Sequence, residues 1–406
     1  MTLKNFRISE KSVVTLVGKI RIRRNVLRPK TKTDIERLFK KEQLRSVVPL
    51  DEYLGLNRIP FKMTIGAMLL IAYWVQRSNS YEEAEEGLRR HTRIDVKNDT
   101  MRFVANTVGK IVFDNDAASA ESAYAELNSG KLSFPAEKRD SELYLQCGGA
   151  MFHSRDRDEN GHTWKENKLG VVFGGDSCFR WTNPKTGERE KRMGKREYIA
   201  YAGSVDIFQK LLFDAALKNG YGKYKTTILI TDGASWIKDM KDSLFHDAIC
   251  ILDFFHLCEN VHKFAEEYFN DNEDKYKTWS KDICDKLRAS EYEDVINILQ
   301  KLDGKRVANC SFKLLNYIND NIDCIDYKTY ENNGWFIGSG AIESANKIVL
   351  QERLKQAGMR WNLETARYIM ALTAKVKSKL WERDVMEAVY KHYGAARASA
   401  PEAESY

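Results

Sequence analysis

Two aspartates each follow a short apolar run, as catalytic acids do in an open α/β sheet. Asp232 follows the run TTILIT, and Asp253 follows ICIL, with His256 three residues later. Such sheets expose catalytic side chains at the carboxyl ends of their strands. We predict that Asp232 either binds a metal ion or caps the next helix. Either Asp253 and His256 face the same cleft, or Asp253 caps the next helix and His256 is a partly buried histidine.

Glu343 is the third acidic candidate. It lies in a segment (337–361) whose apolar residues recur at helical spacing, and Ser339 is placed to cap this helix. Helical geometry puts Glu343 at the margin of the apolar stripe, where a carboxylate can reach a strand end. The alternative is an ion pair with Lys347, one turn along the helix. The stripe consists of Ile342, Ala345 and Val349.

Acids that converge from separate elements suit a hard divalent cation. Phosphodiester hydrolysis and strand transfer need an activated oxygen nucleophile and a stabilised leaving oxyanion, and two Mg²⁺ ions about 4 Å apart supply both. Mg²⁺ prefers carboxylate oxygens. We therefore predict Asp232 and Glu343 as ligands of Mg²⁺ or Mn²⁺, with Asp253 and His256 as further catalytic candidates.

Cationic residues close to these acids are candidates for DNA contacts. Lys347, Arg353 and Arg360 follow Glu343 in the same segment, and Arg102 lies on a predicted upstream helix. Lysine and arginine side chains commonly contact phosphate oxygens. We predict that these four residues contact DNA.

The composition is that of a globular protein with a modest positive charge. The 406 residues carry a formal charge of +7. They are 43% hydrophobic, and this length and hydrophobic content are enough for a sizeable core and more than one domain. Up to Arg45 there are fourteen lysines and arginines against four acids. This local excess favours a polyanionic partner.

Nothing in the sequence supports a membrane role. The seven cysteines contain no C-x-x-C pair, and the first residues lack the apolar region of a signal peptide. The longest apolar run, 65–75, is shorter than the ~20 residues that span a bilayer. We expect a cytoplasmic protein.

Two upstream patterns have both a DNA-binding and an ordinary structural interpretation. The run 13–24, VVTLVGKIRIRR, predicts a strand with one basic face, which either follows DNA phosphates or protects a sheet edge with charge. Helical patterns over 63–76 and 80–91 precede a third helix that starts near Asn98. The last two of these form either a helix-turn-helix or a common helix pair.

From residue 142 onward, three predicted strands precede alternating helices and strands, which indicates an α/β fold with an RNase H-like order. A charged helical stretch then interrupts the pattern. The expected parts are a basic N-terminal segment (1–45), a mainly helical DNA-binding region with a candidate helix-turn-helix (46–117), a linker (118–140), the first part of the RNase H-like core (141–256), a helical insertion (257–333), the last part of the core with C-terminal helices (334–394), and a disordered tail (395–406).

Three ordered blocks resemble the DDE transposases of bacterial insertion sequences, of the ISKra-four type, which are related to Mutator-like transposases. The blocks are TDGASWI (231–237), LDFFHLCENVHKF (252–264) and the segment 337–361, and weaker likeness extends over roughly 12–385. The resemblance implies a protein that binds terminal inverted repeats, cuts DNA with two Mg²⁺ or Mn²⁺ ions and joins the ends to target DNA. It also implies a homo-oligomer, double-stranded DNA as partner and a place at the bacterial nucleoid.

The resemblance assigns roles residue by residue and exposes one departure. Asp232 corresponds to the second acid and Glu343 to the third, while Asp253 and His256 match an accessory D-x-x-H motif. The family's first acid falls at Gly148 of the run QCGGAMF. This replacement puts catalysis in question, and a DNA-binding protein without catalytic activity is the alternative. Three other acids lie nearby in the sequence, namely Asp156, Asp158 and Asp176. Any of them could replace the missing first acid only if the backbone followed a different path.

Overall fold

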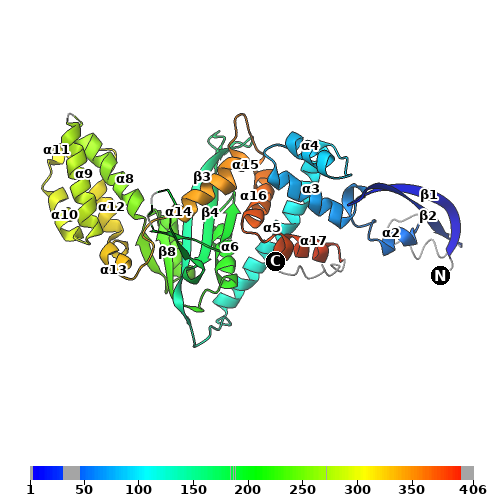
Figure 1. Ribbon diagram of the computed structural model, residues 1–406, viewed down its shortest axis with the longest axis horizontal. Helices are drawn as coiled ribbons and strands as arrows, with labels where there is room; N and C mark the ends of the chain where they lie inside the picture. The colour runs from blue at the N-terminus through cyan, green and yellow to red at the C-terminus, as the bar shows by residue number, and fades with distance from the viewer. Residues whose placement is uncertain are drawn as a thin grey trace. The chain divides into compact units, whose positions relative to one another are not determined.

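The computed structural model describes residues 3–30, 46–182, 184–185, 187, 189–270 and 272–394 (Figure 1). The chain forms two compact units. One comprises Met1–Asp116 with Glu364–Tyr406, and the other comprises Ala117–Leu363. Residues 31–45 of the expected N-terminal segment, and the expected disordered tail (395–406), lie outside the described residues.

The first unit begins with a long antiparallel hairpin. Strands β1 (Leu3–Thr15) and β2 (Gly18–Pro29) pair from Thr15 opposite Gly18 outward. The prediction of one strand over 13–24 was therefore wrong, because the chain turns at Leu16 and Val17. Gly18, with φ of 104°, supplies the left-handed backbone that this turn needs. An apolar turn gives no polar signal in the sequence, which is why the pattern concealed it.

Helices make up the rest of the first unit. The predicted helices are confirmed as α3 (Ile65–Arg77), α4 (Tyr81–His91) and the start of α5 (Asn98–Asn128). The remaining elements are α2 (Pro49–Tyr53), η1 (Pro60–Lys62), α16 (Leu363–Lys377), the π-helix η5 (Trp381–Met386) and α17 (Glu387–His392).

Two boundaries differ from expectation. The predicted linker over 118–140 is helical as far as Asn128, because its first half is rich in the helix formers alanine and glutamate. The C-terminal helical region, expected within 334–394, is interrupted at Lys379, whose φ of 59° follows the end of α16. From Glu364 onward this region joins the first unit rather than the α/β core.

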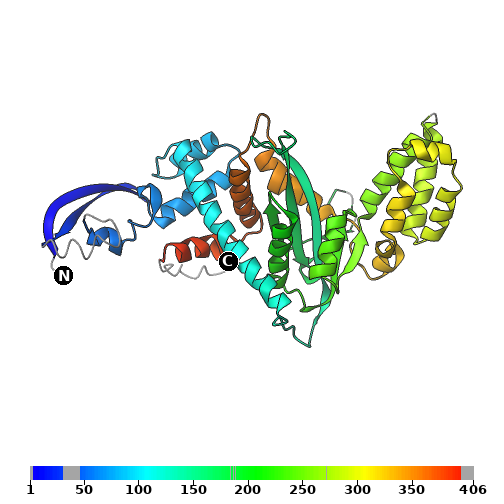
Figure 2. The same cartoon turned by 180° about the vertical axis from the view of Figure 1, so that it is seen from behind.

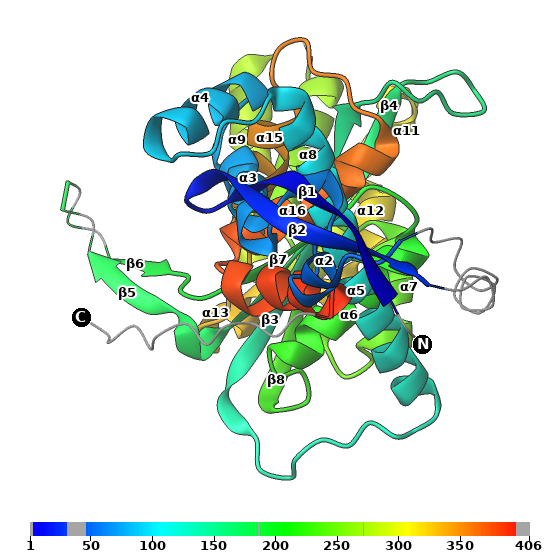
Figure 3. The ribbon, with the colours of Figure 1, turned by 90° about the vertical axis from the view of Figure 1, so that its right-hand side faces the viewer.

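The second unit is built on a mixed five-stranded sheet in the order β7-β4-β3-β8-β9. Strands β3 (Arg139–His153), β4 (Trp164–Gly174) and β7 (Glu197–Tyr201) are antiparallel neighbours, and β8 (Tyr224–Thr231) and β9 (Ile249–Leu252) extend the sheet in parallel with β3. The α/β class, with three antiparallel strands followed by two parallel ones, is confirmed. Figure 3 shows the short hairpin β5 (Phe179–Thr182) and β6 (Arg189–Arg192), which is paired separately from this sheet.

Helices pack on both faces of the sheet. In β4, a Cβ added at Gly170 would touch Leu212 of α6 (Val205–Lys218), whereas a Cβ at Gly148 of β3 would touch Ile342 of α14 (Gly340–Ala345). Gly148 pairs with Leu169, the residue before Gly170, and successive residues in a strand face opposite sides. Helices α6 and α14 therefore cover opposite faces. The short 3₁₀ turn η2 (Gly175–Ser177) follows β4, and α7 (Ser235–Leu244) follows β8.

The predicted helical insertion lies between β9 and α14. Figures 1 and 2 show most of its helices, in green to yellow, gathered into one bundle. They are α8 (Phe254–Tyr268), α9 (Glu273–Arg288), α10 (Tyr292–Gln300), α11 (Gly304–Asn309), α12 (Leu314–Asp320), the 3₁₀ turn η3 (Ile322–Cys324) and α13 (Tyr327–Asn332).

The helix expected within the segment 337–361 starts at Gly340 and changes pitch. After α14 it continues as a π-helix, η4 (Asn346–Gln351), and ends in α15 (Glu352–Leu354). The predicted apolar stripe is confirmed, because Ile342, Ala345 and Val349 are all buried. π-helical turns are rare in proteins overall, and those that occur often lie at functional sites.

Candidate active site

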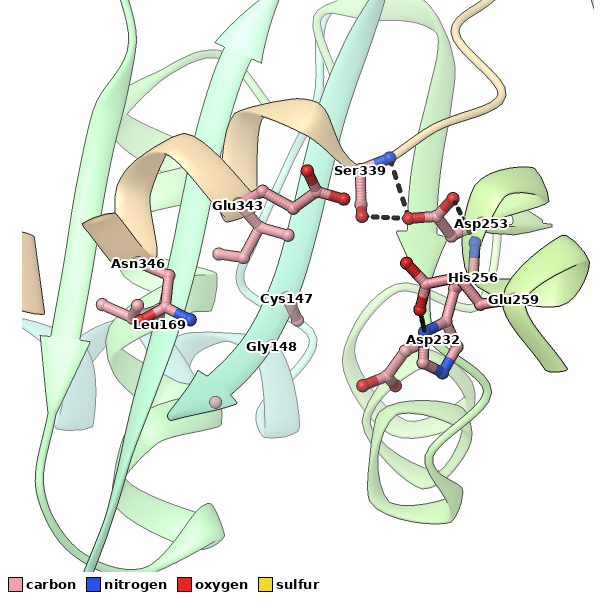
Figure 4. Close-up of a pocket in the computed structure, with 12 residues that line it drawn as sticks. Cys147, Gly148, Leu169, Asp232, Asp253, His256, Glu259, Ser339, Glu343 and Asn346 are labelled. Carbon is pink, nitrogen blue, oxygen red and sulfur yellow. Dashed lines mark hydrogen bonds and ion pairs between the residues drawn. The ribbon is translucent and has the colours of Figure 1, made fainter. Parts of the chain in front are cut away.

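A pocket of about 170 Å³ lies where the ends of β8 and β9 meet α14 and the middle of β3 (Figure 4). Its position follows from the sheet register. Gln146 of β3 pairs with Ile230, and Thr231 pairs with Leu252 of β9, so Gly148, Asp232 and Asp253 continue the register at one level. The lining residues are Cys147, Gly148, Gly149, Leu169, Asp232, Asp253, His256, Glu259, Ser339, Ile342, Glu343 and Asn346.

Asp232 is exposed at the end of β8, as predicted. Its Oδ1 accepts a hydrogen bond from the Ala234 amide at 3.0 Å, and its backbone carbonyl accepts one from the Tyr317 hydroxyl at 2.8 Å. Gly233, at φ of 87°, makes the turn into α7. Helix α7 begins after Ala234 without a side-chain cap, so the interpretation of Asp232 as its N-cap was wrong. The carboxylate stabilises the turn and faces the pocket.

Asp253 has a different role from the catalytic one we considered. It is 2% exposed, and its Oδ1 accepts hydrogen bonds from the amides of Phe255 (2.8 Å) and His256 (3.2 Å). Its Oδ2 accepts bonds from the amide (3.1 Å) and hydroxyl of Ser339. Four donors occupy both oxygens, so Asp253 caps α8 and fixes the chain that enters α14. Its place is that of a positioning residue.

Ser339 does not cap α14 with its side chain, contrary to expectation. Its hydroxyl instead donates to Asp253, because that buried carboxylate is the stronger acceptor. The residue therefore joins the start of α14 to the start of α8.

His256 faces the pocket from α8. Its Nδ1 lies 3.6 Å from the Glu259 carboxylate, and its side chain is 39% exposed. Figure 4 shows this pair on the side of the pocket where Asp232 lies. Sequence reasoning missed Glu259, although its i+3 spacing from His256 places the two on one helix face.

Glu343 is exposed and enters the pocket from α14 (Figure 4). No salt bridge or hydrogen bond of its side chain is found among the described residues. The alternative, an ion pair with Lys347, is not found among the described residues, and the helix changes to π pitch at Asn346, between the two residues. Glu343 thus presents an uncommitted carboxylate, as a metal or substrate ligand would.

Gln146 holds α14 against β3. It is 1% exposed, its Oε1 accepts from the Ile342 amide at 3.0 Å, and its Nε2 donates to the Gly338 carbonyl at 3.4 Å. A Cβ added at Gly148, two residues on and on the same face of β3, would lie 3.3 Å from Cγ1 of Ile342. A side chain at position 148 would therefore enter the pocket beside α14.

No nearby acid occupies the place of Gly148. Asp156 accepts from the Leu363 amide at 2.6 Å, Asp158 accepts from the His162 amide at 2.8 Å, and Asp176 bonds the Tyr224 hydroxyl at 3.1 Å. None of the three lines the pocket. Each is committed to a hydrogen bond outside the pocket.

The pocket offers oxygen ligands of the type that Mg²⁺ takes, but too few for a complete site. Asp232 uses one oxygen for the Ala234 amide, Glu259 lies 3.6 Å from His256, Asp253 is saturated, and Gly148 contributes no ligand, so Glu343 alone is an uncommitted carboxylate among the residues that line the pocket. Within the described ranges, no three histidines, cysteines or acids form a group that could hold a metal ion. The residues present therefore do not fit a two-ion site as they stand.

Cys147 cannot serve as a nucleophile in this pocket. Burial, and to a lesser extent the charge of Asp232, raise the pKa of its thiol far above the usual range. Only the thiolate is a strong nucleophile. The chemistry of the pocket rests on its oxygen and imidazole groups.

The four predicted DNA contacts are placed differently. Lys347 and Arg360 are exposed, as phosphate contacts must be. Arg353 is 4% exposed, with its guanidinium 5.5 Å from the Trp361 ring centre, so its assignment as a DNA contact was wrong. Arg353 follows the π-helix η4 and packs into the interior at that point, which explains its burial. Arg102 is exposed in the first unit, where it pairs with Asp99 at 3.2 Å.

Comparison with known proteins gives a family without an assigned activity. Residues 37–388 match the sequence pattern that defines an uncharacterised protein family, UPF0236. No curated protein matches the chain. None of the described helices combines the length and apolar character that a membrane span requires.

Proposed function

The chain belongs to the uncharacterised protein family UPF0236, and we propose that it is the transposase of an insertion sequence. In this proposal the protein binds terminal inverted repeats, and its α/β unit carries the site for metal-dependent cleavage and strand transfer. Double-stranded DNA, as element ends and as target, is the partner, and the protein acts as a homo-oligomer because two ends must be brought together.

The observation that carries the proposal is the convergence of positions 148, 232 and 343 on one pocket. They come from β3, the end of β8 and α14, which are far apart in sequence. Acids converging from separate elements are what phosphoryl chemistry with divalent ions requires. Two of these three positions, Asp232 and Glu343, are acids, and they reach the pocket from a strand end and from a helix that are far apart in sequence.

The strand order supports an RNase H-like interpretation of the sheet. Three antiparallel strands are extended by two parallel ones, and a helical insertion separates β9 from the helix that carries Glu343. We assign Asp232 and Glu343 as two metal ligands, while Gly148 stands where the resemblance places a third acid and supplies no ligand. His256 and Glu259 lie beside Asp232, where they would bind or orient a water molecule next to the DNA phosphate.

The first unit supplies a basic surface for DNA. On β2, Lys19, Arg21 and Arg23 are exposed at alternate positions and therefore lie on one face of the strand. Helices α4 and α5 are formed as the helix-turn-helix interpretation requires, and Arg102 is exposed on the second. We propose that these elements bind the element ends.

A second candidate is favoured by Gly148. With Gly148 in place of the third acid, the chain would bind element ends without cutting them, either as a decayed transposase or as a repressor of its own element. Its basic surface does not depend on the pocket, so loss of catalysis would leave DNA binding intact.

The test is cleavage and joining of DNA that carries the element's own terminal repeats, with Mg²⁺ and with Mn²⁺. The transposase proposal predicts cut and joined products that disappear in Glu343→Gln. Specific binding with no cleavage in either metal would favour the second candidate. Absence of any preference for the terminal repeats would overturn both.

A further inference from the structure

Cys250 and Cys324 bring two thiols together at the edge of the sheet. Cys250 lies in β9 and Cys324 in η3, the turn near the return of the helical insertion, and β9 packs against η3. The two side chains share a hydrogen bond, and both residues are free thiols. This hydrogen bond thus joins the strand before the helical insertion to a turn near the end of the insertion.

Both thiols line a cavity of about 380 Å³ that is separate from the acidic pocket. Lys238 and Lys241 of α7 line the same cavity, as do acids that include Asp242 and Asp323. A small solute can therefore reach this thiol pair. Cys250 is half-buried and Cys324 is 6% exposed, so a solute reaches the pair through this cavity.

We propose that Cys250 and Cys324 form a dithiol site that a small disulfide oxidises to an intramolecular disulfide. Nothing in the transposase proposal requires this site. In the first step the Cys324 thiolate attacks one sulfur of the small disulfide, which forms a mixed disulfide and releases one small thiol. The Cys250 thiol then loses its proton and attacks Cys324 sulfur, which releases the second small thiol. The protein loses two electrons and two protons, and the small disulfide gains them.

The surroundings distinguish the two thiols. The hydrogen bond from Cys250 lowers the pKa of Cys324, whereas the charges of Lys238 and Lys241 lower the pKa of both thiols against the effect of burial. That same hydrogen bond, together with burial, raises the pKa of Cys250. Since the thiolate is the attacking species, Cys324 is the first nucleophile and Cys250 the resolving thiol.

The disulfide would fasten both ends of the helical insertion. It would close a loop that contains α8 to α12, and β9 leads directly into Asp253, which caps α8. Closing a loop restricts the unfolded chain and so stabilises the folded one. Oxidation is therefore expected to raise the unfolding temperature.

The test exposes the full-length protein to oxidised glutathione, blocks the remaining thiols and maps linked peptides by mass spectrometry. We expect a Cys250–Cys324 linked peptide, its reversal by dithiothreitol and a higher unfolding temperature while it is present. In Cys250→Ser we expect glutathione to remain attached to Cys324, and in Cys324→Ser we expect no attachment at Cys250.

Three outcomes would overturn the proposal. The first is no Cys250–Cys324 peptide in the folded protein at any oxidant concentration. The second is exclusive linkage of another pair, such as Cys258 with Cys284, which also share a hydrogen bond. The third is glutathione attached to Cys250 but not Cys324. DNA binding and cleavage are not readouts here, so these outcomes leave the transposase proposal unaffected.

Discussion

Asp232 and Asp253 each follow a buried strand, yet their oxygens have different environments. Asp253 is buried and satisfies four donors, whereas Asp232 is exposed and uses one oxygen for the amide of Ala234. Burial with complete hydrogen bonding indicates a structural carboxylate. Exposure beside a pocket leaves a carboxylate available for chemistry.

This difference predicts opposite outcomes for the same substitution. Asp253→Asn places an amide donor against other donors in a buried site, and we expect it to lower the free energy of unfolding by about 2–4 kcal/mol. Asp232→Asn keeps the acceptor for Ala234 and should change stability by less than about 0.5 kcal/mol. Urea denaturation of the two variants measures the difference. Equal losses of stability would contradict this division of roles.

Some features of the site could be predicted from sequence and others could not. The strand end at Asp232 and the helix that carries Glu343 were predicted correctly, because strand ends and helical apolar stripes are local patterns. The buried role of Arg353 was missed, because the π turn that starts at Asn346 rotates the following residues and has no sequence signature. Contacts such as Cys250 with Cys324 depend on the tertiary path and leave no trace in local sequence.

At the scale of elements, the seating of α14 on β3 decides where Glu343 points. Gln146 makes this junction with two hydrogen bonds from a buried position. Gln146→Leu keeps a side chain of similar size but leaves the Ile342 amide and the Gly338 carbonyl without these partners. We expect a decrease of about 1–3 kcal/mol in the free energy of unfolding.

Gln351→Leu, on the exposed side of η4, is the control for this substitution. It should change stability by less than about 0.5 kcal/mol. If Gln146→Leu were as stable as the unaltered protein, the two hydrogen bonds would not hold α14 in place.

The helical insertion contains a pH-sensitive contact between Glu267 of α8 and Ser311. The side chain and amide of Ser311 donate to the carboxylate, the amide at 2.6 Å, and they lower the pKa of Glu267 below its ordinary value of 4.5. A lowered folded-state pKa means that the contact stabilises the fold above pH 4.5. The stabilisation disappears as the pH falls through the lower, folded-state pKa.

Glu267→Gln should remove this dependence. The unaltered protein is expected to unfold at higher urea concentration than the variant above pH 4.5, and the difference should shrink as the pH is lowered further. Denaturation curves at a series of pH values measure it. A difference that grows toward acid pH would show that the sign is wrong.

At the scale of the whole molecule, DNA binding and pocket chemistry are predicted to be separable. Arg21→Gln with Arg23→Gln removes two exposed charges from one face of β2. If these residues bind phosphates, affinity for DNA falls, and the slope of log K against log salt decreases by roughly 0.9 for each phosphate that is no longer neutralised. Fluorescence anisotropy over a range of salt concentrations measures both quantities.

Lys277→Gln is the matched control, because this exposed charge on the helical insertion is already paired with Glu273. It should leave the salt dependence of DNA binding unchanged. An unchanged slope in the β2 variant, or an equal change in the control, would contradict a DNA-binding role for the hairpin.

The central claim is that positions 148, 232 and 343 form one phosphodiester-processing site. Metal-dependent cleavage of terminal-repeat DNA by Gly148→Asp, compared with the unaltered chain, tests it most directly. The added side chain meets Ile342 at 3.3 Å, which requires only a small shift. We predict that Gly148→Asp cleaves faster than the unaltered chain, and that adding Asp232→Asn or Glu343→Gln abolishes the gain. A folded, DNA-binding Gly148→Asp protein that shows no gain, or a gain that survives loss of both other acids, would contradict the claim.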